Sequence, residues 1–159
     1  MRFAAVLLSV LLTASPVAAA PGAPKVPELF RQFGLIGTWA VDCRGQASPD
    51  NPRVVDRVVG DGVVEEHSLG PDGALNHYRV LSAKRLSKTR LAVEVIFRPG
   101  GVEDSGAAKP AEERQRLVWS VHDRTRRTLR NQPEGAPLRV KDGIVVDFGL
   151  KTPTLRKCE

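Results

Sequence analysis

The sequence predicts an all-β protein that folds as a single antiparallel up-and-down β-barrel of eight to nine strands, preceded by one short helix. From residue 53 onward, short runs rich in β-branched and aromatic residues alternate with turns built from glycine, aspartate and proline. A helical spacing of apolar residues is found in one short segment, at residues 28–33. Many short strands in one domain must either stack as two sheets or close on themselves, and a chain of successive hairpins favours closure into a barrel.

Residues 1–19 have the pattern of a secretory signal peptide. Arg2 precedes an apolar run from residue 3 to residue 12, and Val17 and Ala19 are the small residues expected before the cleavage site. The apolar run is too short to span a membrane as a helix. We therefore expect an exported monomer, periplasmic or secreted, without a transmembrane segment in the mature chain. It would have a flexible lead-in at residues 20–27 and one barrel domain at residues 28–159.

The barrel domain is expected to start with a helix at residues 28–33, which Gly34 ends. The segment that follows, GLIGTWAVDC at residues 34–43, predicts a turn and then the first strand. In that strand Trp39, Val41 and Cys43 alternate onto one face. This face would anchor the start of the barrel.

The middle of the chain predicts four successive strands, at residues 53–59, 63–69, 75–86 and 90–98. The first two connections, GDG at residues 60–62 and GPDG at residues 70–73, are hairpin signals because glycine adopts the positive φ angles that such turns need. The fourth strand alternates most cleanly and should be central, with one face formed by Leu91, Val93, Val95 and Phe97.

The last third of the chain starts with a loop at residues 99–112, which is rich in glycine, proline, alanine and charge. A strand around Trp119 and another at residues 125–131 follow. The pair Asp142 and Gly143 predicts a two-residue hairpin turn after a strand at residues 138–141. The strand after this turn should alternate along Ile144, Val146, Phe148 and Leu150.

Cys43 and Cys158 are the two cysteines of the chain, and an exported protein with two distant cysteines is expected to contain one disulfide. A pair of metal ligands is the alternative, but neither cysteine lies in a CxxC or Cys/His spacing. The disulfide would join the first strand to the last, which become neighbours when a barrel closes.

The formal net charge is +6 at pH 7. Export argues against nucleic acid as the partner of this charge. Anionic envelope components remain possible partners, and the alternative is that the charge serves solubility alone.

The short helix followed by Gly37, Thr38 and Trp39 resembles the lipocalin and calycin pattern of a Gly-x-Trp motif at the start of an antiparallel barrel. The resemblance implies that Trp39 plugs the closed end of the barrel and that a basic residue of the last strand, Arg156 or alternatively Lys157, packs across its ring. It also points to small exported relatives, among them lipocalin-like bacterial inhibitors of secreted metalloproteases.

The sequence contains no common catalytic motif: it has no GxSxG, HExxH or CxxC segment and no phosphate-binding glycine loop. The three histidines, His67, His77 and His122, belong to different strands, and their spacing does not indicate a metal site. Glu65 and Glu66 are adjacent and point to opposite faces of a strand, so they do not form a paired acid and base. We expect no cofactor.

The leading hypothesis is therefore a non-enzymatic barrel that binds a small or lipidic molecule. An internal cavity would support it, with walls formed by His67, Tyr78, Val93, Val95, Phe97, Trp119 and Phe148. The alternative is a barrel with a filled interior that acts by protein contact, as a protease inhibitor or an envelope-assembly factor, through an exposed patch.

A cluster of arginines around residue 123 predicts an anion-binding surface, formed by Arg124, Arg126, Arg127 and Arg130. Because residues two apart in a strand share a face, Arg124, Arg126 and Arg130 should project together. Arg127 would lie on the other face with Leu129, at the rim of the barrel. A solvated basic face without a partner is the alternative.

Overall fold

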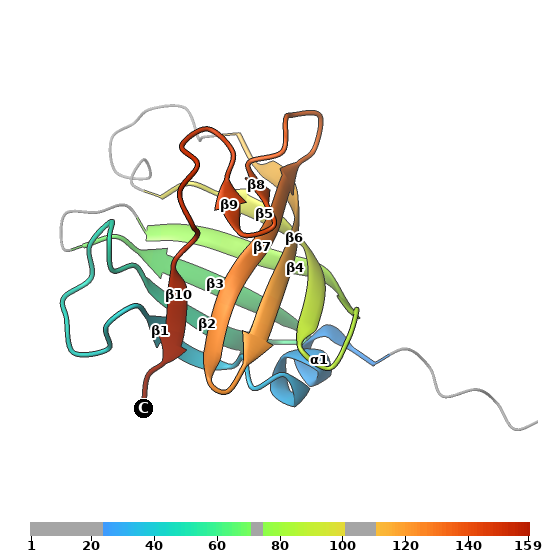
Figure 1. The fold of residues 1–159 in the computed structure, drawn as a ribbon. Coiled ribbons are helices and arrows are strands. Elements are labelled where there is room, and N and C mark those ends of the chain that lie inside the picture. Colours follow the sequence, from blue (N-terminus) through green and yellow to red (C-terminus); the bar gives the residue numbers. More distant parts are fainter. Residues whose placement is uncertain (1–23, 71–74, 101–110) are drawn as a thin grey trace, which may run out of the picture.

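The computed structural model describes residues 24–70, 75–100 and 111–159. The predicted signal peptide lies outside the described residues, as does most of the expected loop at residues 99–112. The chain forms a closed antiparallel barrel with one short helix at one end (Figure 1). The prediction of an all-β single barrel is confirmed.

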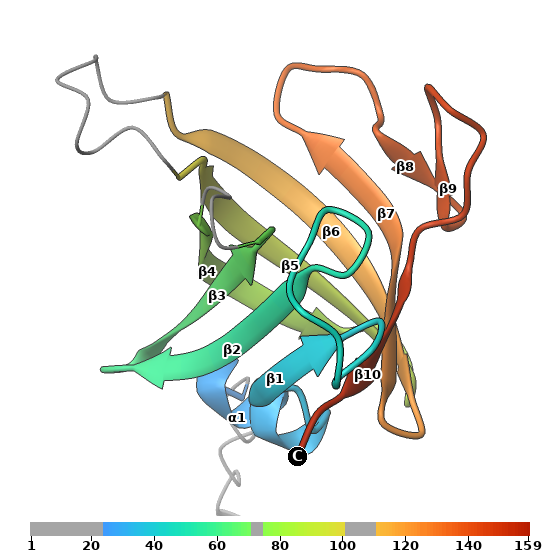
Figure 2. The ribbon, with the colours of Figure 1, turned by 90° about the vertical axis from the view of Figure 1, so that its left-hand side faces the viewer.

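Ten strands form one continuous sheet, in the order β10-β1-β2-β3-β4-β5-β6-β7-β8-β9. They are β1 (Gly37–Ala40), β2 (Arg53–Val59), β3 (Gly62–Ser68), β4 (Leu75–Arg85), β5 (Arg90–Arg98), β6 (Glu113–His122), β7 (Thr125–Pro133), β8 (Val140–Lys141), β9 (Ile144–Val145) and β10 (Thr154–Lys157). Strand β10 pairs with both β1 and β7, which closes the barrel (Figure 2). The hairpin of β8 and β9 continues from β7 beyond this closure.

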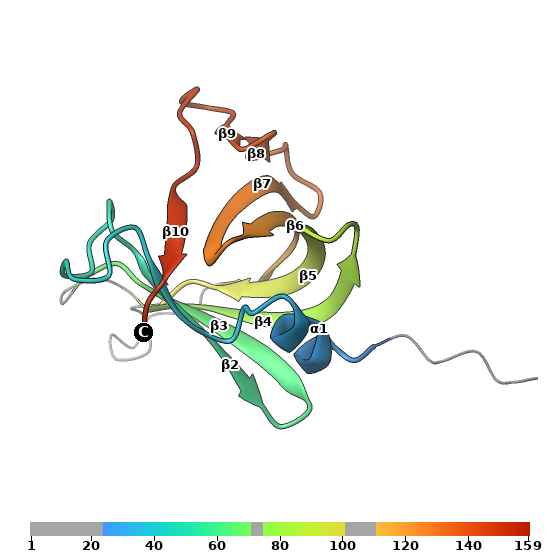
Figure 3. The same ribbon diagram turned by 60° about the horizontal axis from the view of Figure 1, so that its bottom comes forward.

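Helix α1 (Val26–Gln32) lies across the closed end of the barrel (Figure 3). It begins two residues before the predicted helix, because Pro27 suits the first turn of a helix, where its missing N–H is not needed. Leu29 and Phe30 face the barrel and are buried. Gly34, at φ 65°, ends the helix as predicted. Among the described helical residues, none belongs to a helix long and apolar enough to cross a membrane.

The first strand is shorter than predicted. It ends at Ala40, so Val41 is beyond the strand and does not continue its inward face. Trp39 is buried at 1% exposed, whereas Val41 is 38% exposed. The loop after β1 carries Cys43 to Cys158, and the two form the predicted disulfide with a Cα–Cα distance of 5.5 Å. It closes 115 residues of chain, for which loop entropy gives an upper limit of about 4.8 kcal/mol of stabilisation.

The core occupies the half of the barrel nearest α1. Leu91, Val93 and Val95 of β5 are buried, as the alternation in the sequence predicts. On β6 the buried side chains include Trp119, whose ring meets that of Phe30 edge to face at 5.9 Å. Trp39 lies in the same cluster, and its Nε1 donates to the backbone oxygen of Leu35 at 2.8 Å. Apolar burial therefore holds the helix and the closed end together.

The strand predicted at residues 144–150 is wrong beyond Val145. Gly149, at φ 64°, turns the chain back, so that Lys151 pairs with Ile144. A tight loop results, in which Val146, Phe148 and Leu150 are 51%, 74% and 66% exposed. Phe148 is therefore outside the barrel and cannot line an internal cavity.

Candidate functional site

A buried ion cluster crosses the middle of the barrel. Arg126 of β7 donates from Nη1 to Asp56 Oδ2 at 2.7 Å and from Nη2 to Glu65 Oε2 at 2.6 Å. Asp56 of β2 and Glu65 of β3 are directly opposite each other in the sheet, so their carboxyl groups converge on one guanidinium. The guanidinium also lies over the Trp119 ring, at 4.4 Å from the ring centroid. It thus has carboxyl groups and an aromatic face in place of water.

The position of Arg126 corrects the prediction that it projects outward with Arg124 and Arg130. Arg126 pairs with Val121, whose side chain faces the core, and it is 4% exposed. The residues of β7 are mostly polar, so apolar alternation does not reveal which face is inside. The two carboxyl groups from β2 and β3 make burial of the arginine possible, because both accept its hydrogen bonds and a carboxylate balances its charge.

The basic residues around Trp39 also differ from the prediction. Lys157 is directly opposite Trp39 in the sheet, and its Nζ lies 5.7 Å from the ring centroid. Arg126 reaches the same ring at 5.8 Å. Arg156 is exposed, because neighbouring residues of a strand face opposite sides. Lys157, the alternative considered from the sequence, occupies the place that Arg156 was expected to take.

The cluster holds its protons unequally. Burial raises the pKa of Asp56 well above its ordinary value, which favours the protonated form. Glu65 is buried as well, but the charges of Arg126 and His67 outweigh desolvation and lower its pKa. Burial alone would lower the pKa of Arg126, yet the two carboxyl groups raise it. The opposite directions of the two shifts favour Glu65 over Asp56 as the ionised partner of Arg126.

His67 and Tyr78 extend the cluster toward the mouth of the barrel. His67 Nε2 lies 2.5 Å from Glu65 Oε1, which fixes the orientation of the imidazole. The Tyr78 ring lies against His67 at 4.5 Å between centroids and stacks on Phe97 at 4.8 Å. Burial raises the pKa of the Tyr78 hydroxyl, which is therefore a neutral donor and acceptor. One wall of the mouth is thus a row of three rings.

A cavity of about 210 Å³ adjoins this wall, close to the volume of seven water molecules in the liquid. Its wall is mixed. Apolar side chains such as Val54, Leu117, Trp119, Val140 and Leu155 alternate with polar ones, which are Glu65, His67, Tyr78, Arg126, Arg127, Thr128, Asn131 and Thr152. Asn131 donates from Nδ2 to Gln115 Oε1 at 3.2 Å, while its Oδ1 is buried without a hydrogen-bond partner among the described residues. The cavity can therefore both donate and accept hydrogen bonds.

The structure distributes the predicted cavity residues over four places: the cavity, the core, the wall of rings at the mouth and the outside of the barrel. His67, Tyr78 and Trp119 line the cavity. Val93 and Val95 pack in the core, and Phe97 supports Tyr78. Phe148 lies outside the barrel, as described above.

The pairing of Asp56 with Glu65 was not predicted from the sequence, because the two residues belong to different strands. Asp56 lies two residues after Val54 on β2, and Glu65 lies two residues after Val63 on β3. Each carboxyl group is therefore on the same inward face as a buried valine. A charged residue at an inward position of two neighbouring strands was the signal available in the sequence.

The remaining arginines of the predicted anion surface do not form one patch. Arg127 donates to Gly143 O at 2.6 Å and to Thr152 Oγ1 at 3.1 Å, and it lines the cavity at the inner rim. Arg124 is exposed at the β6–β7 turn, and Arg130 is exposed farther along β7. These two are separated by the length of the strand.

Within residues 24–70, 75–100 and 111–159, no group of three His, Cys, Asp or Glu side chains is placed to hold a metal ion. No family model matches the chain, and neither a curated protein nor a solved structure is significantly similar to it.

Proposed function

We propose that this protein is an exported, non-enzymatic barrel that binds a small polar molecule in the cavity at its mouth. The observation that carries the proposal is the cavity itself, which combines a restricted volume with donors and acceptors held by the barrel wall. Small-molecule sites typically place a few polar groups in this way to orient a ligand.

The size of the cavity and the polar groups in its mixed wall favour a small molecule with polar groups over a lipid. Sites for drug-sized ligands usually measure roughly 300–1,000 Å³, whereas this cavity measures about 210 Å³. A lipid chain would also remove water from the carboxyl, hydroxyl and guanidinium groups of the wall without replacing its hydrogen bonds, which is costly. A small ligand with its own donors and acceptors would replace that water.

Two contacts support binding rather than catalysis. The imidazole of His67 directs Nε2 at Glu65, and the hydroxyl of Thr152 donates to Thr128 O at 2.7 Å. The histidine and this hydroxyl thus have separate partners and are not set against each other as base and nucleophile.

The disulfide and the N-terminal sequence pattern support export. Disulfides persist in oxidising compartments, and Cys43–Cys158 joins the two ends of the barrel. The periplasm is the proposed location, with full secretion as the alternative.

Native mass spectrometry of protein purified from the periplasm tests the proposal. We expect the wild type to carry a small molecule and the variant Asn131→Leu, which fills the cavity and removes its unpaired oxygen, to lose it. Arg130→Leu, at the neighbouring exposed position, is the matched control and should retain the ligand. A wild type without bound ligand, or equal retention by both variants, would contradict the proposal.

A second candidate function is protein contact through the loop that follows β9, at residues 146–150, and one observation favours it. Val146, Phe148 and Leu150 are all more than half exposed on a loop closed by the hydrogen bond from Val145 N to Leu150 O at 2.8 Å. Three side chains offer far less than the roughly 800 Å² per partner of a standard interface. Such a tip fits an apolar cleft of a partner protein better than a flat surface.

Site-specific photo-crosslinking in the exporting cell tests this candidate. A crosslinker at position 148 should capture one partner that the same group at Val59, which is 52% exposed, does not capture. Phe148→Ser should then weaken the purified complex at least about tenfold, equivalent to ~1.4 kcal/mol. Equal capture at both positions would argue against this function.

A further inference from the structure

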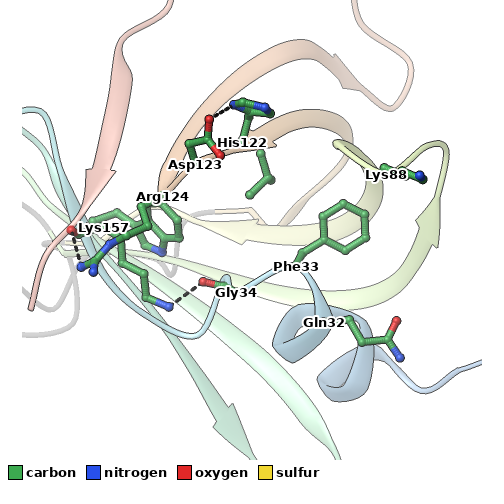
Figure 4. A pocket seen from close by; sticks show the side chains of 10 residues that line it. Gln32, Phe33, Gly34, Lys88, His122, Asp123, Arg124 and Lys157 are labelled. Atoms are coloured by element: carbon green, nitrogen blue, oxygen red, sulfur yellow. Dashed lines mark hydrogen bonds and ion pairs between the residues drawn. The ribbon is translucent and has the colours of Figure 1, made fainter.

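A second pocket, of about 400 Å³, lies at the opposite end of the molecule from the mouth. It is bounded by the end of α1, the β4–β5 turn, the β6–β7 turn and β10 (Figure 4). It is separate from the cavity at the mouth, and Trp39 and Lys157 form part of its wall.

The pocket has an excess of positive charge. Three cations line it, Lys88, Arg124 and Lys157, against one carboxylate, that of Asp123. Asp123 Oδ2 lies 2.8 Å from His122 Nδ1. An anion entering the pocket therefore meets more positive than negative charge.

Lys157 is held in position with donors to spare. Its Nζ donates to Gly34 O at 2.6 Å and lies over the Trp39 ring. An ammonium group has three donors, so a bound anion can accept from the other two. Gly37 allows this arrangement, because a Cβ at this position would lie 3.3 Å from Lys157 Cε and the backbone has a φ of 129°.

Arg124 occupies an unfavourable backbone conformation. Asp123 and Arg124 have φ angles of 45° and 61°, in the left-handed region where hairpin turns normally place asparagine and glycine. Within the part of the chain that the structure describes, the side chain of Arg124 makes two long polar contacts, 3.5 Å to Lys157 O and 3.4 Å to Glu159 Oε1. Strained residues of this kind are concentrated at ligand sites, where the side chain has a use that glycine could not supply.

Phe33 gives the pocket an apolar wall between Lys88 on one side and Arg124 with Lys157 on the other (Figure 4). The guanidinium of Arg85 lies over the Phe33 ring at 4.7 Å, which adds a further positive charge nearby. We propose that this pocket binds the phosphate or carboxylate group of a molecule that also carries an apolar or aromatic body. The anionic group would sit between Arg124 and Lys157, and the body would cover Phe33.

The test is an NMR titration of the full mature protein with phenyl phosphate, with benzyl alcohol as the neutral probe of similar shape. Phenyl phosphate should shift the backbone amides of Gly34, Arg124 and Lys157, and its binding should weaken as salt is added. Inorganic phosphate should bind more weakly, and benzyl alcohol should leave these amides unchanged. Vesicles of phosphatidylglycerol and of phosphatidylcholine then distinguish a lipid headgroup from a free anion as the source of the bound group.

Arg124→Gly is the informative variant, because glycine accepts the φ of 61° while the cation is lost. It should bind phenyl phosphate at least about tenfold more weakly, with an unchanged or higher Tm. Arg130→Ala removes an equal charge outside the pocket and should bind like the wild type. If Arg124→Gly does not fold, Lys88→Gln at the exposed turn provides the same comparison. Unchanged binding in the pocket variants, equal binding of benzyl alcohol, or shifts confined to Tyr78 and Asn131 at the mouth would overturn the proposal.

Discussion

The closed end of the barrel is filled by Phe30, Trp39 and Trp119, whereas the mouth holds Tyr78 and Asn131 around a cavity. Both ends use inward-facing positions of the same antiparallel strands. The helix α1 covers one end and excludes water there, so apolar side chains are favoured at that end. The mouth lacks such a cover in the described residues, so solvent reaches the cavity there and polar side chains are tolerated in its wall.

The ion cluster lies at the boundary between these two regions. Arg126 contacts the Trp119 ring on the core side and Glu65 toward the mouth. Buried ion pairs contribute little net stability, but removing one member leaves a charge without compensation. The barrel thus has a packed closed end that stabilises the protein, a charged boundary and a mouth available to a ligand.

The largest expected effect is at the closed end. Trp39→Ala should lower the free energy of unfolding by about 3–5 kcal/mol, because the side chain is 1% exposed and its removal leaves a large cavity in the core. Urea denaturation measures this loss.

Two variants make this prediction specific to the closed end. Arg156→Ala, at an exposed position of β10, should change the free energy of unfolding by less than about 0.5 kcal/mol. Tyr78→Phe at the mouth keeps the ring and should cost less than about 1 kcal/mol. A loss below about 1 kcal/mol for Trp39→Ala, or equal losses at both ends, would remove the distinction between the two regions.

An intermediate effect is expected at the boundary. Glu65→Gln should cost about 1.5–3 kcal/mol at neutral pH, because Arg126 loses the carboxylate with the lowered pKa, and Asp56, whose pKa is raised by burial, is the poorer counter-ion. Asp56→Asn should cost less than about 1 kcal/mol, since the native Asp56 is favoured in its neutral form. Equal losses in the two variants would show that the two carboxyl groups share the charge equally.

The pH dependence of stability gives the smallest and most specific effect. The lowered pKa of Glu65 contributes stability that is present above its unfolded value of about 4.5 and is lost as the pH falls through the native pKa. The raised pKa of Asp56 acts in the opposite direction. Its contribution is complete below the unfolded value of about 3.8 and is lost as the pH rises toward the native pKa.

Urea denaturation across the acid-to-neutral range measures both contributions. The advantage of the wild type over Glu65→Gln should shrink as the pH falls below about 4.5. Asp56→Asn should gain on the wild type as the pH rises above about 3.8. Stability curves that run parallel to that of the wild type would refute this assignment of protons.

The similarity to lipocalins and the binding of a ligand stay predictions. The alternating apolar patterns of two segments, at residues 91–95 and 144–150, had different outcomes in the structure. The clean apolar alternation of Leu91, Val93 and Val95 was sufficient to place these residues in the core. The alternation along residues 144–150 was equally clean and was misleading, because Gly149 turns the chain and β10 takes the place beside β7. Periodicity predicts a strand only where the neighbouring strand is free to pair with it.

The sequence by itself determined the class of fold, the helix before the first strand and the pairing of Cys43 with Cys158, because hairpin turns, local spacing and a single pair of cysteines leave few alternatives. The tertiary structure alone decided the direction of Arg126 and the meeting of Asp56 with Glu65. Their contacts join residues 70 and 61 positions apart, so no local pattern contains them. An arginine among polar neighbours can face either side of a strand, and the opposite carboxyl groups of β2 and β3 make the interior the stable side.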